Sequence, residues 1–444
     1  MSPCRLLDSS FAIDRRALAA FRVAIALILL FDLFIRSGSI VEHYSDRGIL
    51  PRTQWVEHNV GTTRWSLHAM NGEPAFQRVL MAAAALAALS MLLGFKTRAA
   101  VAIAWLLTHS IQMRNPMINN GGDVLLRAML LWSIFLPLGS RWSIDAWIAR
   151  ARAPSRQGGA EGERDSDVFD ASSDAGLRQP SAPPCRDGAS RVLSIASACI
   201  LLQFALMYVF SGLYKLNDTW AAGDAMRRAL SFDLYVKPMG ESMLASEGLL
   251  HTTTIVVPWM EIILPLLCFV PIFTSWFRAL AIIAFIGLHM GIEMTMTTVL
   301  FPWVCMASWL LFVPSRWFGR ARNTPPEPRP EGRGPSDARP PARTLPGGAQ
   351  PNSVRGMIVQ LPLAALFAFV LLWNLSNYQE HRESNRLLGN DWAWLAECTG
   401  LDQVWEMFRE PPVNTGWYVV IGTLTNGKDV NLLTGDPVTR EDMT

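Results

Sequence analysis

The sequence carries little charge for its length. Only 17% of its 444 residues are Asp, Glu, Lys or Arg, whereas soluble globular chains carry about 25%. Apolar runs alternate with polar, proline-rich stretches, so the composition excludes a single soluble enzyme domain and a mostly disordered chain. The formal net charge is only +2, and nothing in it indicates binding to nucleic acid.

Cysteine is scarce as well, with six residues and no Cys-x-x-Cys spacing. This scatter excludes a disulfide scaffold and offers no spacing typical of a metal site. Cys199, Cys268 and Cys305 stand inside apolar runs, where cysteine usually acts as a small buried hydrophobic residue. We therefore expect neither a redox nor a metal function from the cysteines.

Long apolar runs are what the sequence has instead. A helix that crosses the hydrocarbon core needs about 20 mostly apolar residues, and nine segments approach that length. They predict an all-α polytopic membrane bundle of about nine transmembrane helices. The candidate segments are 17–36, 78–95, 98–113, 123–138, 192–214, 253–272, 276–296, 298–313 and 357–376.

The segments between these runs divide the chain into blocks. Residues 1–150 hold the first four helices, with 37–77 as an interfacial loop that is too polar to span the membrane. Helices five to eight occupy 191–317, and the ninth occupies 356–376. The two polar stretches that separate the helical blocks are rich in Pro, Ser, Gly and charge, which is typical of disordered linkers. These linkers are 151–190 and 318–355.

Both linkers are also rich in arginine. The positive-inside rule therefore predicts that both linkers and the N-terminus lie in the cytoplasm and that the C-terminus lies outside. In the tail, 377–444, apolar and polar residues alternate on either side of Asn426 and Gly427. This pattern predicts a β-hairpin. We expect a small β-containing extramembrane module on the outer side, with a structural cap as the simplest role.

Ionisable residues inside membrane spans usually mark a pathway, a site or a structural pair. Lys215 ends the fifth predicted helix and shares a face with Tyr208 and Ser211, while Gly212 allows a helix or a flat ligand to approach closely. Lysine occurs only four times among 39 basic residues. Arginine would supply a fixed charge, so lysine suggests a group that can lose its proton. The alternative is a lysine that extends to the membrane interface.

A second polar group starts the fourth predicted helix. Asn120 and Asp123 suit a helix N-terminus that binds an anion or a polarised oxygen. Asp123 and Arg127 stand four residues apart on one face, which also fits a structural ion pair that ties helices together. Both interpretations stay open.

Other polar residues are isolated in apolar surroundings. His109 lies in the third predicted helix, and His289 and Glu293 lie four residues apart in the seventh. The last two fit a hydrogen-bonded interhelical pair better than a metal site, because no third ligand accompanies them. Glu261 and Asp32 have no evident local partner, so each needs a partner on another helix, a proton or water.

Four segments resemble a known family. They read FRVAIALILLFDLFIRSGSIVEHYSDRGILPR, YVFSGLYKLNDTWAAGDAM, HMGIEMTMTTVLFPWVCMASWLLFVPSRWF and QVWEMFREPPVNTGWYVVIGTLTNGKDVNLL. Together they resemble the bacterial HTTM (horizontally transferred transmembrane) domain family, which includes vitamin K-dependent gamma-glutamyl carboxylase. The resemblance runs from about Phe11 to Trp317, without the linker 151–190.

The resemblance implies a reaction and a base. The carboxylase oxidises a reduced naphthoquinone with O₂ to an epoxide, and the strong base so generated removes a proton from a glutamate γ-carbon, to which CO₂ adds. The segment SGLYKLNDTW is similar to the one that holds the catalytic lysine, which implies that Lys215 has this role. The implied partners are a lipid bilayer, a quinol of the vitamin K or menaquinol type, O₂, CO₂ and a protein glutamate, without a metal.

Around this base we expect substrate contacts from Asn120, Tyr208, Ser211, Gly212 and Trp220, although an aromatic residue at a helix end also serves as an interface anchor. The supporting polar interior comprises His109, Asp123, Arg127, Glu261, His289 and Glu293.

The sequence also departs from the carboxylase. An Asn-His pair of the carboxylase contacts the quinone oxygen, and here NNGGD aligns Asn120 with the asparagine and Gly121 with the histidine. The long lumenal region that holds substrate propeptides is missing. Two functions stay open. One is a lysine-base enzyme that oxidises a naphthoquinol, with or without glutamate carboxylation. The other is a non-catalytic membrane protein that binds quinone or lipid or supports a membrane assembly.

Overall fold

The computed structural model describes residues 3–152, 190–319 without 234, 354–411 without 384 and 385, 421–431 without 426, and 437. Most of the predicted linkers 151–190 and 318–355 lie outside the described residues.

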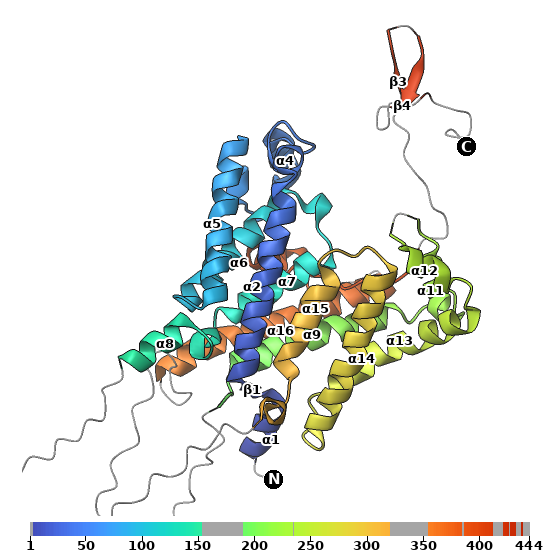
Figure 1. Ribbon diagram of the computed structural model, residues 1–444. Helices are drawn as coiled ribbons and strands as arrows, with labels where there is room; N and C mark the ends of the chain where they lie inside the picture. Colours follow the sequence, from blue (N-terminus) through green and yellow to red (C-terminus); the bar gives the residue numbers. More distant parts are fainter. Residues whose placement is uncertain are drawn as a thin grey trace, which may run out of the picture.

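Helices make up most of the described chain (Figure 1). The first half contains α1 (Pro3–Phe11), α2 (Arg15–Ser37), α3 (Ile40–Tyr44), α4 (Arg52–Asn59), α5 (Pro74–Leu93), α6 (Thr97–Arg114), α7 (Gly121–Ser133) and α8 (Ile144–Ala151). The second half contains α9 (Ile195–Tyr214), α10 (Asp218–Ala221), α11 (Ala225–Leu230), α12 (Pro238–Met243), α13 (Glu247–Leu267), α14 (Thr274–Thr295), α15 (Phe301–Trp309), α16 (Val354–Glu383) and α17 (Ala393–Thr399). Short 3₁₀ turns include η1 (Leu67–Ala69) and η5 (Leu310–Phe312).

Two small antiparallel sheets accompany the helices. β1 (Ile13–Asp14) pairs with β2 (Arg191–Val192), so the start of α2 lies beside the start of α9. β3 (Ile421–Thr423) pairs with β4 (Asp429–Asn431), with Gly422 opposite Val430. Gly427 has a φ of 77°, which a glycine adopts without strain. The predicted hairpin is confirmed, although Asn426 lies outside the described residues.

Six helices in the described ranges are long and apolar enough to cross a membrane. They are α2, α5, α9, α13, α14 and the Gln360–His381 part of α16. The chain is therefore a multi-pass membrane protein, but the count of nine spans is not confirmed. α7 has 13 residues and is about 20 Å long, short of the roughly 30 Å hydrocarbon core. Phe301–Phe312 is likewise a shorter apolar helix. The orientation of the termini stays a prediction.

The predicted interfacial loop 37–77 folds over the end of the bundle. It contains α3, α4 and η1, and it buries the side chains of Tyr44 and His68. His68 Nδ1 lies 2.7 Å from Ser110 Oγ of α6. The loop therefore packs on the ends of the helices through specific polar contacts.

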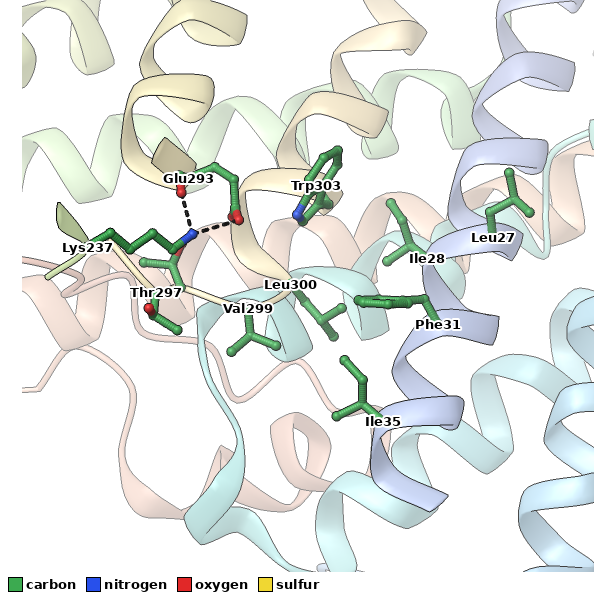
Figure 2. A pocket seen from close by; sticks show the side chains of 11 residues that line it. Leu27, Ile28, Phe31, Ile35, Lys237, Glu293, Thr297, Val299, Leu300 and Trp303 are labelled. Carbon is green, nitrogen blue, oxygen red and sulfur yellow. Dashed lines mark hydrogen bonds and ion pairs between the residues drawn. The ribbon is translucent and has the colours of Figure 1, made fainter. Parts of the chain in front are cut away.

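A groove opens between α2 and the segment that leads into α15 (Figure 2). Glu293 of α14 and Lys237 form the polar end of the groove, and the exposed face of α2 forms one wall. Leu300 lines this groove and also belongs to the main hydrophobic core, so the groove borders the centre of the bundle.

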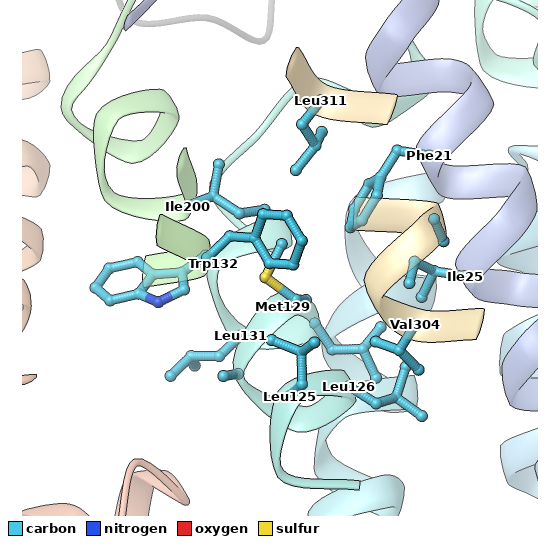
Figure 3. Close-up of a cluster of buried hydrophobic side chains, with 14 of the residues drawn as sticks. Phe21, Ile25, Leu125, Leu126, Met129, Leu131, Trp132, Ile200, Val304 and Leu311 are labelled. Carbon is cyan, nitrogen blue, oxygen red and sulfur yellow. The ribbon is translucent and has the colours of Figure 1, made fainter. Parts of the chain in front are cut away.

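α7 lies at the hydrophobic centre, packed on α6, α9 and α15. Neighbouring helices cover it on several sides, and every residue from Leu125 to Ser133 is buried. Inside a membrane such packing stabilises the bundle through van der Waals contacts. The core side chains labelled in Figure 3 are Phe21, Ile25, Leu125, Leu126, Met129, Leu131, Trp132, Ile200, Val304 and Leu311.

Candidate functional site

Lys215 stands at the C-terminus of α9 and is enclosed by the protein. Its residue is only 3% exposed. Nζ donates to Ser211 Oγ at 2.5 Å, one turn back on α9, and to Glu261 Oε2 of α13 at 2.7 Å. The interface alternative for Lys215 is therefore wrong, because the amine is held inside the bundle. Of the three possibilities left open for Glu261, which were a partner on another helix, a proton or water, the structure has the first.

Gly212 brings α9 and α13 together at this point. A Cβ atom on Gly212 would lie 2.7 Å from the Pro258 carbonyl oxygen and 2.7 Å from Ile262 Cγ1. Both distances are shorter than carbon atoms tolerate, so the glycine is required by the close approach of α13. Of the two neighbours predicted to approach Gly212 closely, a helix or a flat ligand, the structure has the helix α13, which fills this space.

Trp220 of α10 lies beside the lysine. Its ring centroid is 5.6 Å from Lys215 Nζ, within the range of a cation–π interaction. The indole Nε1 donates to the backbone oxygens of Phe408 at 2.9 Å and Arg409 at 3.0 Å. Trp220 is thus a buried link between the lysine and the C-terminal segment, which we define as residues 401–411.

Tyr208 extends the polar face of α9 by two turns. Its hydroxyl lies 2.6 Å from His289 Nε2 of α14 and accepts a hydrogen bond from Trp309 Nε1 at 3.0 Å. His289 is buried, and its Nδ1 has no hydrogen-bond partner among the described residues. The expected interhelical bond of His289 is confirmed with Tyr208 as the partner.

Glu293 does not share that partner. It forms an ion pair with Lys237, with 3.0 Å between Nζ and Oε1. His289 and Glu293 therefore point to different neighbours and do not form a joint ligand pair, although they are one turn apart on α14.

Asp123 belongs to a second polar cluster, at the start of α7. One of its oxygens pairs with the Arg36 guanidinium of α2, while the other accepts the Asn120 N–H at 2.8 Å in a capping box. Both oxygens are used, so the predicted pair of Asp123 with Arg127 is wrong. Arg36 also pairs with Asp32 at 2.8 Å, so Asp32 has a local partner four residues along its own helix, contrary to our expectation.

Arg127 instead reaches the C-terminal part of the chain. It donates to the Gly400 carbonyl oxygen at 2.8 Å, to Gln112 Oε1 at 3.0 Å and to Asp402 Oδ1 at 2.9 Å. His109 is fully buried, with its ring centroid 4.4 Å from that of Trp65. Neither ring nitrogen of His109 has a hydrogen-bond partner in the described part of the chain.

Asn120 and Gly121 line a second cavity, of about 470 Å³. The side-chain oxygen of Asn120 accepts the Gly122 N–H at 2.7 Å and so caps α7. A Cβ atom on Gly121 would overlap Met407 Sδ of the C-terminal segment. A side chain at 121 would therefore require the end of the Met407 side chain to move.

One buried pair was missed by the sequence analysis. Gln203 of α9 and Gln403 of the C-terminal segment exchange amide hydrogen bonds of 2.7 and 3.2 Å. Gln203 is a lone polar residue in an apolar run, and this was the available signal. Nothing local marks Gln403 as its partner, because it lies 200 positions away.

Comparison with known proteins gives one match. A family model described as the HTTM domain matches residues 186–317. Residues 186–317 are therefore similar to the HTTM domain, and the rest of the chain lies outside this match. No curated protein and no solved structure matches the chain. The predicted resemblance is confirmed for the HTTM domain, and the carboxylase-like and bacterial features stay predictions.

The HTTM domain contains the cluster around Lys215, including Glu261 and His289, whereas Asn120 and Arg127 precede the matched residues. The C-terminal segment contacts both clusters. Asp402 pairs with Arg127, and the backbone of Phe408 accepts from Trp220. Most of the predicted site residues thus form two clusters joined by a segment outside the matched residues, whereas Glu293 lies apart from both and pairs with Lys237.

Proposed function

We propose that this multi-pass membrane protein is an enzyme in which Lys215 takes a proton from the hydroxyl group of a reduced naphthoquinone. The observation that carries this proposal is the 2.7 Å contact between buried Lys215 Nζ and Glu261 Oε2. At this distance the carboxylate accepts a hydrogen bond from the ammonium group and offers a direct route for its proton. Glu261 can then accept the ammonium proton, which leaves an amine with a free electron pair.

The residues around the amine fit a proton-transfer role. Ser211 Oγ holds Nζ in position, and Tyr208 with His289 provides a hydroxyl–imidazole pair on the same side of α9. α13 fills the space at Gly212, so we infer that a flat substrate approaches on the side of Trp220 and displaces its ring.

The balanced reaction follows the resemblance. A naphthoquinol and O₂ give the quinone epoxide and water, and each product receives one of the two oxygen atoms of O₂. If glutamate is the second substrate, its γ-carbon loses a proton and CO₂ forms the new carbon–carbon bond. This makes the proposed activity that of a quinol-epoxidising monooxygenase, with or without a carboxylase step. The arginine-rich linkers support a location in the cell membrane with the N-terminus in the cytoplasm.

Oxygen uptake by the purified protein with reduced vitamin K or a menaquinol tests this proposal. Lys215→Ala should abolish uptake, and Lys215→Arg should not restore it because arginine keeps its proton. Lys96→Arg is the matched control, since Lys96 is an exposed lysine that belongs neither to the Lys215 cluster nor to the groove. Equal uptake in wild type and Lys215→Arg would exclude the lysine as the base.

A non-catalytic role is the second candidate. It is favoured by the position of Lys215 and Glu261 directly beside the tight α9–α13 contact at Gly212, where an ion pair also has a structural use. In that case the protein binds quinone or lipid or supports a membrane assembly. Lysine variants would then leave any quinol turnover unchanged, while deletion of 377–444 would abolish association with a partner.

A further inference from the structure

The groove beside α2 has a volume of about 530 Å³, within the usual range of small-molecule sites. One wall is apolar and comes from α2, and the opposite wall comes from the segment that leads into α15 (Figure 2). None of its lining residues belongs to the Lys215 cluster. The residues used below are Leu27, Phe31, Lys237, Glu293, Thr298 and Val299.

The polar end of the groove has unused hydrogen-bonding capacity. Lys237 Nζ donates to the Glu293 carbonyl oxygen at 2.5 Å and to Glu293 Oε1 at 3.0 Å, which uses two of its three N–H groups. Glu293 Oε2 and Thr298 Oγ1 are buried without a partner among the described residues. These two oxygens are therefore available to a hydrogen-bond donor in the groove.

The apolar wall faces the surroundings of the protein. Leu27 is 52% exposed and Phe31 is 54% exposed, and both lie on a helix long and apolar enough to cross a membrane. Such exposed apolar positions on a membrane helix contact lipid. The groove is therefore open to a molecule that arrives from the bilayer.

The backbone at the groove is strained. Val299 has a φ of 50°, which is a rare conformation for a β-branched residue. Strain of this kind concentrates at functional sites. It agrees with a binding role for the groove but does not identify the ligand.

We propose that the groove binds a neutral lipid with a hydroxyl group in its head. A hydroxyl both donates and accepts, so it can donate to Glu293 Oε2 and accept from the third N–H of Lys237. The ion pair has no net charge, and a phosphate head would place its negative charge against the glutamate carboxylate. The apolar part of the lipid lies along Leu27 and Phe31. This inference does not rest on the proposed activity of Lys215.

The binding test uses the full-length protein in nanodiscs of dioleoylphosphatidylcholine. Three probes are added in separate arms: dioleoylglycerol, a menaquinol, and dioleoylphosphatidylglycerol as the anionic control. Lipid that stays bound after purification is measured by mass spectrometry. We expect at least one neutral probe to be enriched about tenfold over the anionic control, and the arms tell which hydroxyl head is preferred.

Two variants test the position of the site. Leu27→Trp should fill the groove and abolish the enrichment, whereas Leu86→Trp, at an exposed position of α5, should leave it unchanged. Glu293→Gln should shift the preference toward phosphatidylglycerol, because the charge of Lys237 is then unopposed.

Three results would overturn the proposal: no enrichment of either neutral probe, equal enrichment of the anionic lipid, or full binding in a folded Leu27→Trp protein. Elution as a single species confirms that each variant is folded. None of these results bears on oxygen uptake, so the fate of the Lys215 proposal is decided separately.

Discussion

The Lys215–Glu261 pair should contribute a large coupling free energy to folding. Both side chains are almost completely buried, at 3% and 8% exposure. Removal of one member of a buried pair costs about 3–5 kcal/mol, because the other charge is left uncompensated. Replacement of both by apolar residues of similar volume is often close to neutral. Lys215→Met and Glu261→Leu should therefore each destabilise strongly, while the double variant should recover most of the loss.

The magnitude follows from the same numbers. If each single variant loses about 3 kcal/mol and the double variant loses little, the coupling free energy is about 6 kcal/mol in magnitude. Each single loss corresponds to roughly a 150-fold change in the unfolding equilibrium. The contacts that each new side chain makes with the rest of the bundle occur in one single variant and in the double variant, so they cancel in the cycle.

The measurement is reversible unfolding of the four proteins in mixed micelles of dodecylmaltoside and sodium dodecyl sulfate, followed by circular dichroism. The control cycle uses Arg227 and Glu247, whose side chains are 45% and 84% exposed. Exposed pairs contribute less than about 1 kcal/mol. If the buried cycle gave no more coupling than this control, Nζ and the carboxylate would not be paired in the folded protein. The proposed route for the lysine proton would then be wrong.

Three further predictions concern other parts of the bundle. Burial, together with the charge of Arg114, lowers the pKa of His68 from 6.5 to about 3. Between pH 7 and pH 5 the His68 side chain becomes protonated in the unfolded chain but stays neutral in the folded protein. The free energy of unfolding should therefore fall by about 2 kcal/mol over this range. His68→Asn should flatten a melting profile measured over that range. Gln403→Leu should lower stability by about 1–3 kcal/mol, because Gln203 loses its partner, and protease digestion should then cut within the C-terminal segment sooner. Gly212→Val should disrupt the α9–α13 contact and cost several kcal/mol in the same unfolding assay.

The local features of the chain were predictable from the sequence. Apolar length predicted nine spans, and six of these correspond to helices long and apolar enough to cross a membrane. The turn residues around Gly427 predicted the hairpin. The cost of a charge in lipid marked Glu261 as a group that needs a partner, a proton or water, but it left burial and an interface position of Lys215 as open alternatives. Each of these inferences depends on residues that are close together in the sequence or on a single side chain.

The identity of the partners was not predictable, because it depends on how distant segments meet. Spacing of four residues suggested that Asp123 pairs with Arg127. Instead, Asp123 pairs with Arg36, which lies 87 positions before it, and Arg127 pairs with Asp402, which lies 275 positions after it. The same spacing was overlooked at Asp32, which does pair with Arg36. Spacing rules describe isolated helix surfaces. In a packed bundle, each buried charge takes the partner that fully satisfies it.

The C-terminal segment is an integral part of the bundle, because buried polar groups from three helices depend on it. If it left, Arg127 would lose Asp402, Gln203 would lose Gln403, and the Trp220 indole would lose both of its acceptors. Each such loss costs about 1–3 kcal/mol in a buried setting, because the remaining group is left without its partner. Since the HTTM domain match ends at residue 317, the polar interior of that domain is completed by residues outside the match.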